Sequence, residues 1–212
     1  VKPMKNNNQL LQSAWRQRLL QELPQHDRKQ RHSIVRWLLD NNHCGQINRQ
    51  LTGEELTPID SRLEYRYRLL KERYLEMDYT EGYRSLISRL SAVTAQYCSV
   101  LFNKHGQKFH KVIINLIQQV VQKLVKNDPY LQRRFERIAQ ETSDINLRES
   151  LSLATVEEYC LHPIKNKPLF IHCLCQNIYQ QDGKYSQQLI NSRRFNETDN
   201  LSNLMEKVTI FR

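Results

Sequence analysis

The scarcity of glycine strongly limits the folds open to this chain. It contains 5 glycines in 212 residues, whereas average usage of about 7% would give roughly 15. Strand-rich folds use glycine in turns and bulges, and phosphate-binding loops use it where the backbone must approach a ligand closely. We therefore expect helices joined by short loops, and an all-α fold.

Apolar residues recur at helical spacing along most of the chain. This pattern predicts a single multi-helix domain of roughly seven to eight helices over residues 9–183. A flexible N-terminus (1–8) is expected before it, and a polar, mobile C-terminal tail (184–212) after it. The strongest apolar period covers residues 109–124, which we expect to be the central core element. Residues 142–154 show a weaker pattern and are interpreted as a broken segment.

Capping residues predict where helices begin. Proline is favoured at the first helical position, so a capping residue followed by proline is a strong start signal. A turn between two helices is predicted from Asn103 to Gln107, which include Gly106. The predicted N-caps are Asp27, Thr57 (before Pro58), Thr80, Asp128 (before Pro129) and Thr155, and Pro168 is predicted to open the last helix.

The chain is basic, with 32 Lys and Arg against 22 Asp and Glu and a net charge of +10. Such a field attracts nucleic acid, an anionic membrane surface or an acidic protein, and does not choose among them. The cations are concentrated in residues 1–36, where a solvated surface is the alternative interpretation. The predicted nucleic-acid-binding residues are Arg16, Arg18, Arg28, Lys29, Arg31 and Arg36, with Arg133, Arg134 and Arg137 as a second, smaller patch.

The cysteines predict neither disulfides nor a metal site. Five scattered cysteines fit a reducing compartment, and with no apolar stretch of spanning length we expect a cytoplasmic protein without membrane contact. Zinc could use four of Cys160, His162, His172, Cys173 and Cys175. However, Cys173 and Cys175 lie two residues apart, which on a helix places them on nearly opposite faces. We expect core packing instead, and no cofactor.

No established catalytic motif occurs in the sequence. The glycines are isolated, so neither a Walker loop nor a dinucleotide-binding fingerprint is present. Cys44 beside His43 is interpreted as part of a helix-ending turn and not as a nucleophile and its base. A helix-turn-helix over residues 33–51 would have a short second helix. We expect a protein that is not an enzyme.

One run of residues resembles a known group of proteins. The run V-E-E-Y-C-L-H-P-I-K-N-K-P-L-F, from Val156 to Phe170, resembles a segment of uncharacterised, sigma-factor-like helical proteins of cyanobacteria. The similar stretch extends from about Asp128 to Cys175. The resemblance implies a transcription regulator, but such proteins carry a sigma-type helix-turn-helix after this region, where this chain has a polar tail. It identifies no functional residue.

The sequence thus predicts a non-enzymatic regulatory protein. We expect it to bind DNA or RNA, or the transcription machinery such as RNA polymerase, through its basic N-terminal helical region. The alternative is a helical protein–protein adaptor or oligomer without nucleic-acid binding. One continuous positive face would favour nucleic acid, whereas cations interleaved with carboxylates would favour the adaptor.

Overall fold

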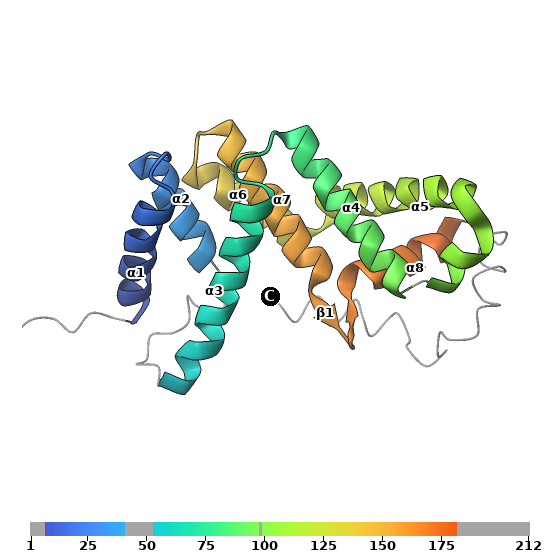
Figure 1. The fold of residues 1–212 in the computed structure, drawn as a ribbon, viewed down its shortest axis with the longest axis horizontal. Coiled ribbons are helices and arrows are strands. Elements are labelled where there is room, and N and C mark those ends of the chain that lie inside the picture. Colours follow the sequence, from blue (N-terminus) through green and yellow to red (C-terminus); the bar gives the residue numbers. More distant parts are fainter. Residues whose placement is uncertain (1–6, 41–52, 98, 182–212) are drawn as a thin grey trace, which may run out of the picture.

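The all-α prediction is confirmed. The computed structural model describes residues 7–40, 53–97 and 99–181, and within these ranges it has eight helices and one two-stranded hairpin (Figure 1). Residues 1–6 of the predicted flexible N-terminus, the polar tail and most of the possible helix-turn-helix lie outside the described residues, whereas residues 7 and 8 belong to the first helix. The elements are α1 (Asn7–Glu22), α2 (Arg28–Leu39), α3 (Gly53–Arg73), α4 (Tyr79–Tyr97), α5 (Ser99–Asn127), α6 (Pro129–Glu141), α7 (Ile145–Leu161), β1 (Pro163–Ile164), β2 (Lys167–Pro168) and α8 (Leu169–Gln181).

Helix α7 occupies the centre of the fold. It packs against α2, α3, α4, α6 and α8, and in Figure 1 it runs between the α1–α3 end and the end formed by α4, α5 and α8. Its buried residues lie on all sides of the helix: Leu147, Ser150, Leu151, Leu153, Ala154, Thr155, Val156, Glu157 and Cys160. The prediction that residues 109–124 form the central element was wrong. The segment 142–154, predicted to be broken, has a break only at residues 142–144, after which 145–154 belong to the continuous helix α7. A helix buried all round has no single apolar stripe, so its periodicity is weak.

Two predicted helix starts are confirmed. The Asp27 carboxylate accepts a hydrogen bond from the Gln30 backbone at 2.7 Å, and the Gln30 side chain accepts one from the Asp27 backbone at 2.8 Å, which completes a capping box. The Asp128 carboxylate accepts from the Tyr130 and Leu131 backbones, with Pro129 in the first turn. Both aspartates therefore satisfy amides that have no partner within the helix.

The predictions of N-caps at Thr80 and Thr155 were wrong, because in each case a nearby aspartate caps the helix. Asp78 caps α4 through the Glu81 backbone N–H at 2.9 Å, so the helix begins before Thr80. Asp144 caps α7 through the Leu147 backbone N–H at 3.0 Å. The Thr155 hydroxyl lies inside α7 and donates to the carbonyl of Leu151, one turn earlier, which is the usual bond for a threonine within a helix.

Two helices are longer than predicted. Helix α3 begins at Gly53, four residues before the expected cap at Thr57. Helix α5 is continuous over 29 residues and contains the expected turn at 103–107. A single glycine inside a helix costs only about 1 kcal/mol. Helix α5 packs against α4, α6 and α8, and this tertiary packing stabilises the helix by more than such a cost.

The polar side chains on α7 are matched by partners from the surrounding helices. Ser150 donates to the carbonyl of Tyr74 at 2.8 Å, and the Tyr74 hydroxyl donates to the buried carboxylate of Glu157. Burial beside that carboxylate raises the pKa of Tyr74 well above its usual range. On another side, the Trp37 indole N–H donates to the Thr155 hydroxyl at 2.9 Å. These bonds fix how α2 and α3 sit on α7, because an unpaired buried polar group is costly.

The central position of α7 predicts where the chain is sensitive to truncation. Leu151 is fully buried on α7, whereas Leu20 on α1 is 57% exposed. We expect Leu151→Ala to lower the free energy of unfolding by about 2–5 kcal/mol, the range for buried leucine. The matched change Leu20→Ala should stay within about 0.5 kcal/mol. Urea unfolding followed by circular dichroism measures both, and equal losses in the two variants would contradict the assignment of α7 to the core.

Candidate nucleic-acid interface

The six predicted binding residues lie on α1 and α2, which pack side by side (Figure 1). They do not form one surface. Arg18, Arg31 and Arg36 bond to carboxylates or carbonyls of the protein, whereas Arg16, Arg28 and Lys29 are exposed and have no carboxylate partner among the described residues. The division is visible only in the structure, because all six occur in the same stretch of basic sequence.

Arg18 is used to join α1 to α3. Its guanidinium pairs with both carboxylate oxygens of Glu64 and with Glu22 at 2.5 Å. It also stacks on the rings of Trp15 and Tyr67, at 4.8 and 5.0 Å from their centroids. These carboxylates raise the pKa of Arg18 above its usual range. A guanidinium held by two carboxylates and two rings is a structural group, and the prediction that Arg18 belongs to an open binding surface is not supported.

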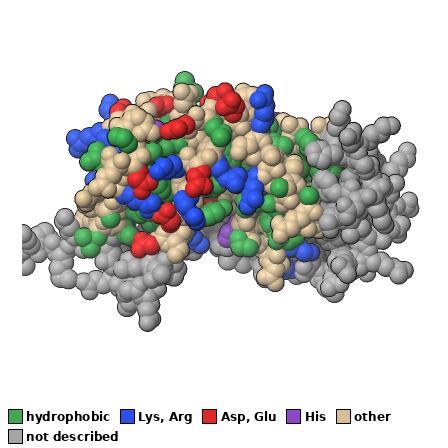
Figure 2. Space-filling model, in the orientation of Figure 1, with side chains coloured by type: hydrophobic (Ala, Val, Ile, Leu, Met, Phe, Trp, Pro, Cys, Tyr) green, Lys and Arg blue, Asp and Glu red, His purple; other side chains and the backbone are tan. Residues whose placement is uncertain are grey.

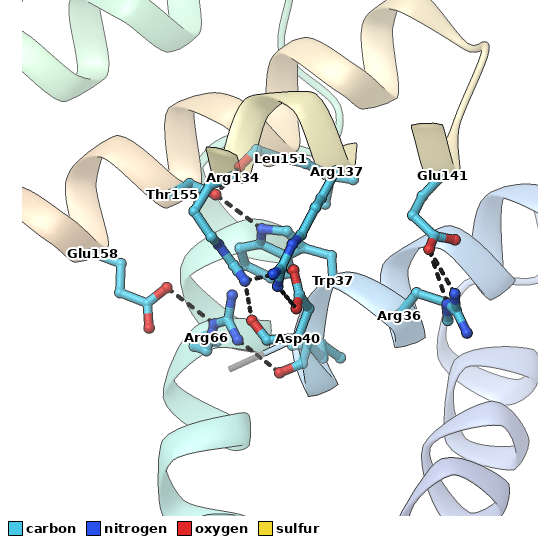
Figure 3. Close-up of polar contacts among 11 residues, drawn as sticks. Arg36, Trp37, Asp40, Arg66, Arg134, Arg137, Glu141, Leu151, Thr155 and Glu158 are labelled. Carbon is cyan, nitrogen blue, oxygen red and sulfur yellow. Dashed lines mark hydrogen bonds and ion pairs between the residues drawn. The ribbon is translucent and has the colours of Figure 1, made fainter. Parts of the chain in front are cut away.

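Arg31 and Arg36 are likewise engaged in the fold. Arg31 donates to the carbonyl of Leu23 at 3.2 Å and to that of His26, beyond the C-terminal end of α1. Arg36 donates through Nε and Nη2 to one oxygen of Glu141, at 3.0 and 2.8 Å (Figure 3). The first contact orders the α1–α2 turn and the second holds α2 against the end of α6.

Arg16, Arg28 and Lys29 remain exposed. The side chains of Arg28 and Lys29 form no hydrogen bond or ion pair with any residue that the structure describes. Arg16 contacts the exposed ring of His32, with 3.3 Å between Nη2 and Nδ1. We call these four residues, Arg16, Arg28, Lys29 and His32, the α1–α2 patch.

The predicted second patch on α6 is mostly an internal ion-pair cluster. The Arg134 side chain is 6% exposed and pairs with Asp40 at 2.6 Å, and Arg137 pairs with the other oxygen of Asp40 at 2.7 Å. Figure 3 shows both arginines reaching down from α6 to the C-terminal end of α2. Of this group, only Arg133 projects into solvent without a carboxylate partner among the described residues.

A fully buried arginine, which sequence reasoning missed, lies beside this cluster. Arg66 stacks on Trp37 at 4.3 Å from the ring centroid and donates to the carbonyl of Leu38 at 2.7 Å. Its Nε lies 3.0 Å from a carboxylate oxygen of Glu158 on α7. Burial lowers the pKa of Arg66. In the sequence Arg66 stands among alternating charges on α3, so no local signal distinguishes it from its exposed neighbours.

The cysteines of this predicted cluster pack in or against the core, whereas His162 and His172 are partly exposed. Cys160 is buried on α7, and Cys173 packs against the core from α8. Burial raises the pKa of the Cys173 thiol to about 11 and that of Cys160 further. Both are therefore protonated and poorly nucleophilic near neutral pH. Within residues 7–40, 53–97 and 99–181, no three His, Cys, Asp or Glu side chains are grouped to hold a metal ion.

Two open hollows flank α1 and α2. One, of about 440 Å³, lies between α1 and α3 beside Trp15, Arg18 and Glu64. The other, of about 420 Å³, lies between α2 and α6 over Trp37. The ion pairs of Arg18 and of Arg36 border them, and neither is lined by a histidine or cysteine of the described chain.

The surface charge is mixed on the face seen in Figure 2. Lys and Arg side chains gather at the α1–α2 end, whereas over the middle of the molecule they alternate with Asp and Glu. A continuous positive face is not present on this side. On this face the cationic surface is accordingly limited in extent.

Comparison of the chain with protein-family models, with curated proteins and with solved structures finds no match. The resemblance to sigma-factor-like proteins therefore stays a prediction. None of the described helices has the length and apolar character needed to cross a bilayer.

The ion pairs of α1 predict an acid-sensitive contribution to stability. Hydrogen bonds from Lys71, then Arg18 and Tyr67, lower the pKa of Glu22 to about 2. A lowered folded-state pKa stabilises the protein above the unfolded value of about 4.5, and this contribution is lost as pH falls toward about 2. We expect Glu22→Gln to lower the free energy of unfolding by about 1 kcal/mol at neutral pH, a small value because Glu22 is partly exposed to solvent. Urea unfolding across this range should show the two proteins converging at low pH, and a constant difference would contradict the contribution of Glu22.

Proposed function

We propose that this chain is a non-enzymatic regulatory protein that contacts the phosphates of DNA or RNA through the α1–α2 patch. The observation that carries the proposal is the exposure of Arg28 and Lys29, without a described partner, beside Arg16 and His32. Most other cations of the first two helices are held by carboxylates or carbonyls of the protein. The patch is thus the part of α1 and α2 whose positive charge is directed outward.

The position of the patch makes an anionic partner favourable. Arg28 and Lys29 form the first turn of α2, where the helix dipole is positive and adjacent cations are unfavourable. A phosphate group placed there would interact with both side chains and with the dipole. Because the patch has only three arginine and lysine side chains, we expect weak, sequence-independent binding that positions the protein on a nucleic acid.

The absence of catalysis is also part of this proposal. The buried cysteine thiols have raised pKa values, which disfavours nucleophilic chemistry. Glu157, the most buried carboxylate of the described chain, is occupied by Tyr74, with Arg73 at 3.6 Å and Arg89 at 3.9 Å. These groups are accounted for by the packing of α7.

A protein–protein adaptor is the second candidate. Leu10 and Leu20 on α1 are 51% and 57% exposed, and Leu20 follows Arg16 by one helical turn. Mixed charge over the middle of the face in Figure 2 also favours a protein partner. On this alternative an acidic, apolar surface of another protein would cover α1, and nucleic acid would not bind.

The salt dependence of binding separates the two candidates. Three phosphate contacts, by Arg16, Arg28 and Lys29, predict a slope of log affinity against log salt of about −2.7 on duplex DNA. Replacing both Arg28 and Lys29 with alanine should reduce the slope to about −0.9, since each lost contact removes about 0.9. Fluorescence anisotropy with a labelled duplex, repeated with single-stranded RNA, measures the slope.

The matched control is the double change Lys126→Ala and Arg133→Ala. Both residues are exposed cations at the α5–α6 junction, so the change removes the same charge from another surface. We expect the control to keep the parent slope. An equal loss of slope in both variants would show a non-specific charge effect. If the parent protein does not bind at low salt, the protein–protein adaptor becomes the favoured function of the α1 surface.

A further inference from the structure

The ring of His32 contacts Arg16 within the α1–α2 patch. The Nη2 of Arg16 lies 3.3 Å from Nδ1 of His32. A guanidinium can only donate, so Nδ1 must accept and the imidazole proton must lie on Nε2. Protonating Nδ1 would break this hydrogen bond and place two cations in contact.

Two further cations lie near His32 on the same helix. Arg28 and Lys29 lie one turn earlier on the same helix, and like charges at this spacing repel. The acidic groups near α2 in the described chain are already engaged. Asp27 caps the helix through Gln30, Glu141 of α6 pairs with Arg36, and Asp144 before α7 accepts a hydrogen bond from the Gln30 side chain.

A bound polyanion reverses this balance. A phosphate oxygen that accepts a hydrogen bond from Arg16 competes with Nδ1 for the guanidinium. The released Nδ1 can then take a proton from solvent, and the resulting imidazolium gains a favourable interaction with the phosphates. Imidazole is the side chain whose charge changes in the mildly acidic to neutral range.

We propose that the α1–α2 patch takes up a proton on His32 when it binds nucleic-acid phosphates, so that binding strengthens as the pH falls. The inference rests on the proposed function and adds a pH-dependent regulation to it. The sign follows from linkage: a ligand that favours the protonated form binds more tightly at lower pH. Between about pH 8 and about pH 5.5 we expect the affinity to rise roughly three- to tenfold.

Calorimetry can measure the proton directly. A short DNA duplex is titrated into the full chain near pH 6.5 at low salt, in two buffers with different heats of ionisation. The difference in observed enthalpy gives the number of protons taken up. The parent should take up a substantial fraction of one proton, and His32→Gln, which cannot be charged, should take up close to none.

A second histidine variant and a charged variant complete the design. His162 lies at the far end of α7, so His162→Gln should keep the uptake of the parent. His32→Arg is permanently charged and should bind without uptake, with an affinity that no longer depends on pH in this range. This variant tests the inference even if the glutamine variant is damaged.

The outcomes distinguish this inference from the proposed function. Binding by the parent with no proton uptake, or with uptake that persists in both His32 variants, overturns the inference and leaves phosphate binding standing. No binding at any pH at low salt overturns both. Uptake that disappears in both His32 variants and persists in His162→Gln supports the inference.

Discussion

The burial of α7 on every side is the constraint on which the rest of the structure depends. A helix in that position cannot leave a polar side chain without a partner, because each unpaired buried group costs about 1–3 kcal/mol. Ser150, Thr155 and Glu157 are accordingly bonded to groups on other helices. Each of these hydrogen bonds requires a particular distance and angle. Together they therefore restrict the positions of α2 and α3 far more tightly than apolar contact alone.

The same constraint decides which cations are available to a partner. Arg66 is buried, forms an ion pair with Glu158 of α7 and stacks on Trp37. Arg134 forms an ion pair with Asp40. The 32 Lys and Arg residues of the sequence therefore overstate the number of cations that are available to a partner. On the described parts of α1 and α2, the exposed cations without a carboxylate partner belong to the α1–α2 patch, and the proposed interaction with anions would depend on these three cations and on His32.

The sequence predicted the fold where local chemistry determines it. Asp27 and Asp128 cap helices because a carboxylate just before a helix accepts hydrogen bonds from the free amides of its first turn. Helix α7 was missed because its signal is tertiary. Leu153 lies beside Gly82 of α4 and Thr155 bonds to Trp37 of α2, so the pattern becomes clear only when these neighbours are in place. The candidate site was predicted in part. Arg28 and Lys29 are exposed as expected, whereas the partners of Arg18 and Arg36, Glu64 and Glu141, are far away in sequence and carry no local signal.

Native-state hydrogen exchange tests the central position of α7 most directly. A helix packed against five elements should exchange its amides only through global unfolding, whereas a peripheral helix opens locally. The account predicts that the amides from Leu151 to Cys160 are the slowest among the described residues, with a free energy of exchange equal to that of global unfolding. Amides of α7 that exchange as fast as those of α1, through a partial opening of the fold, would contradict it.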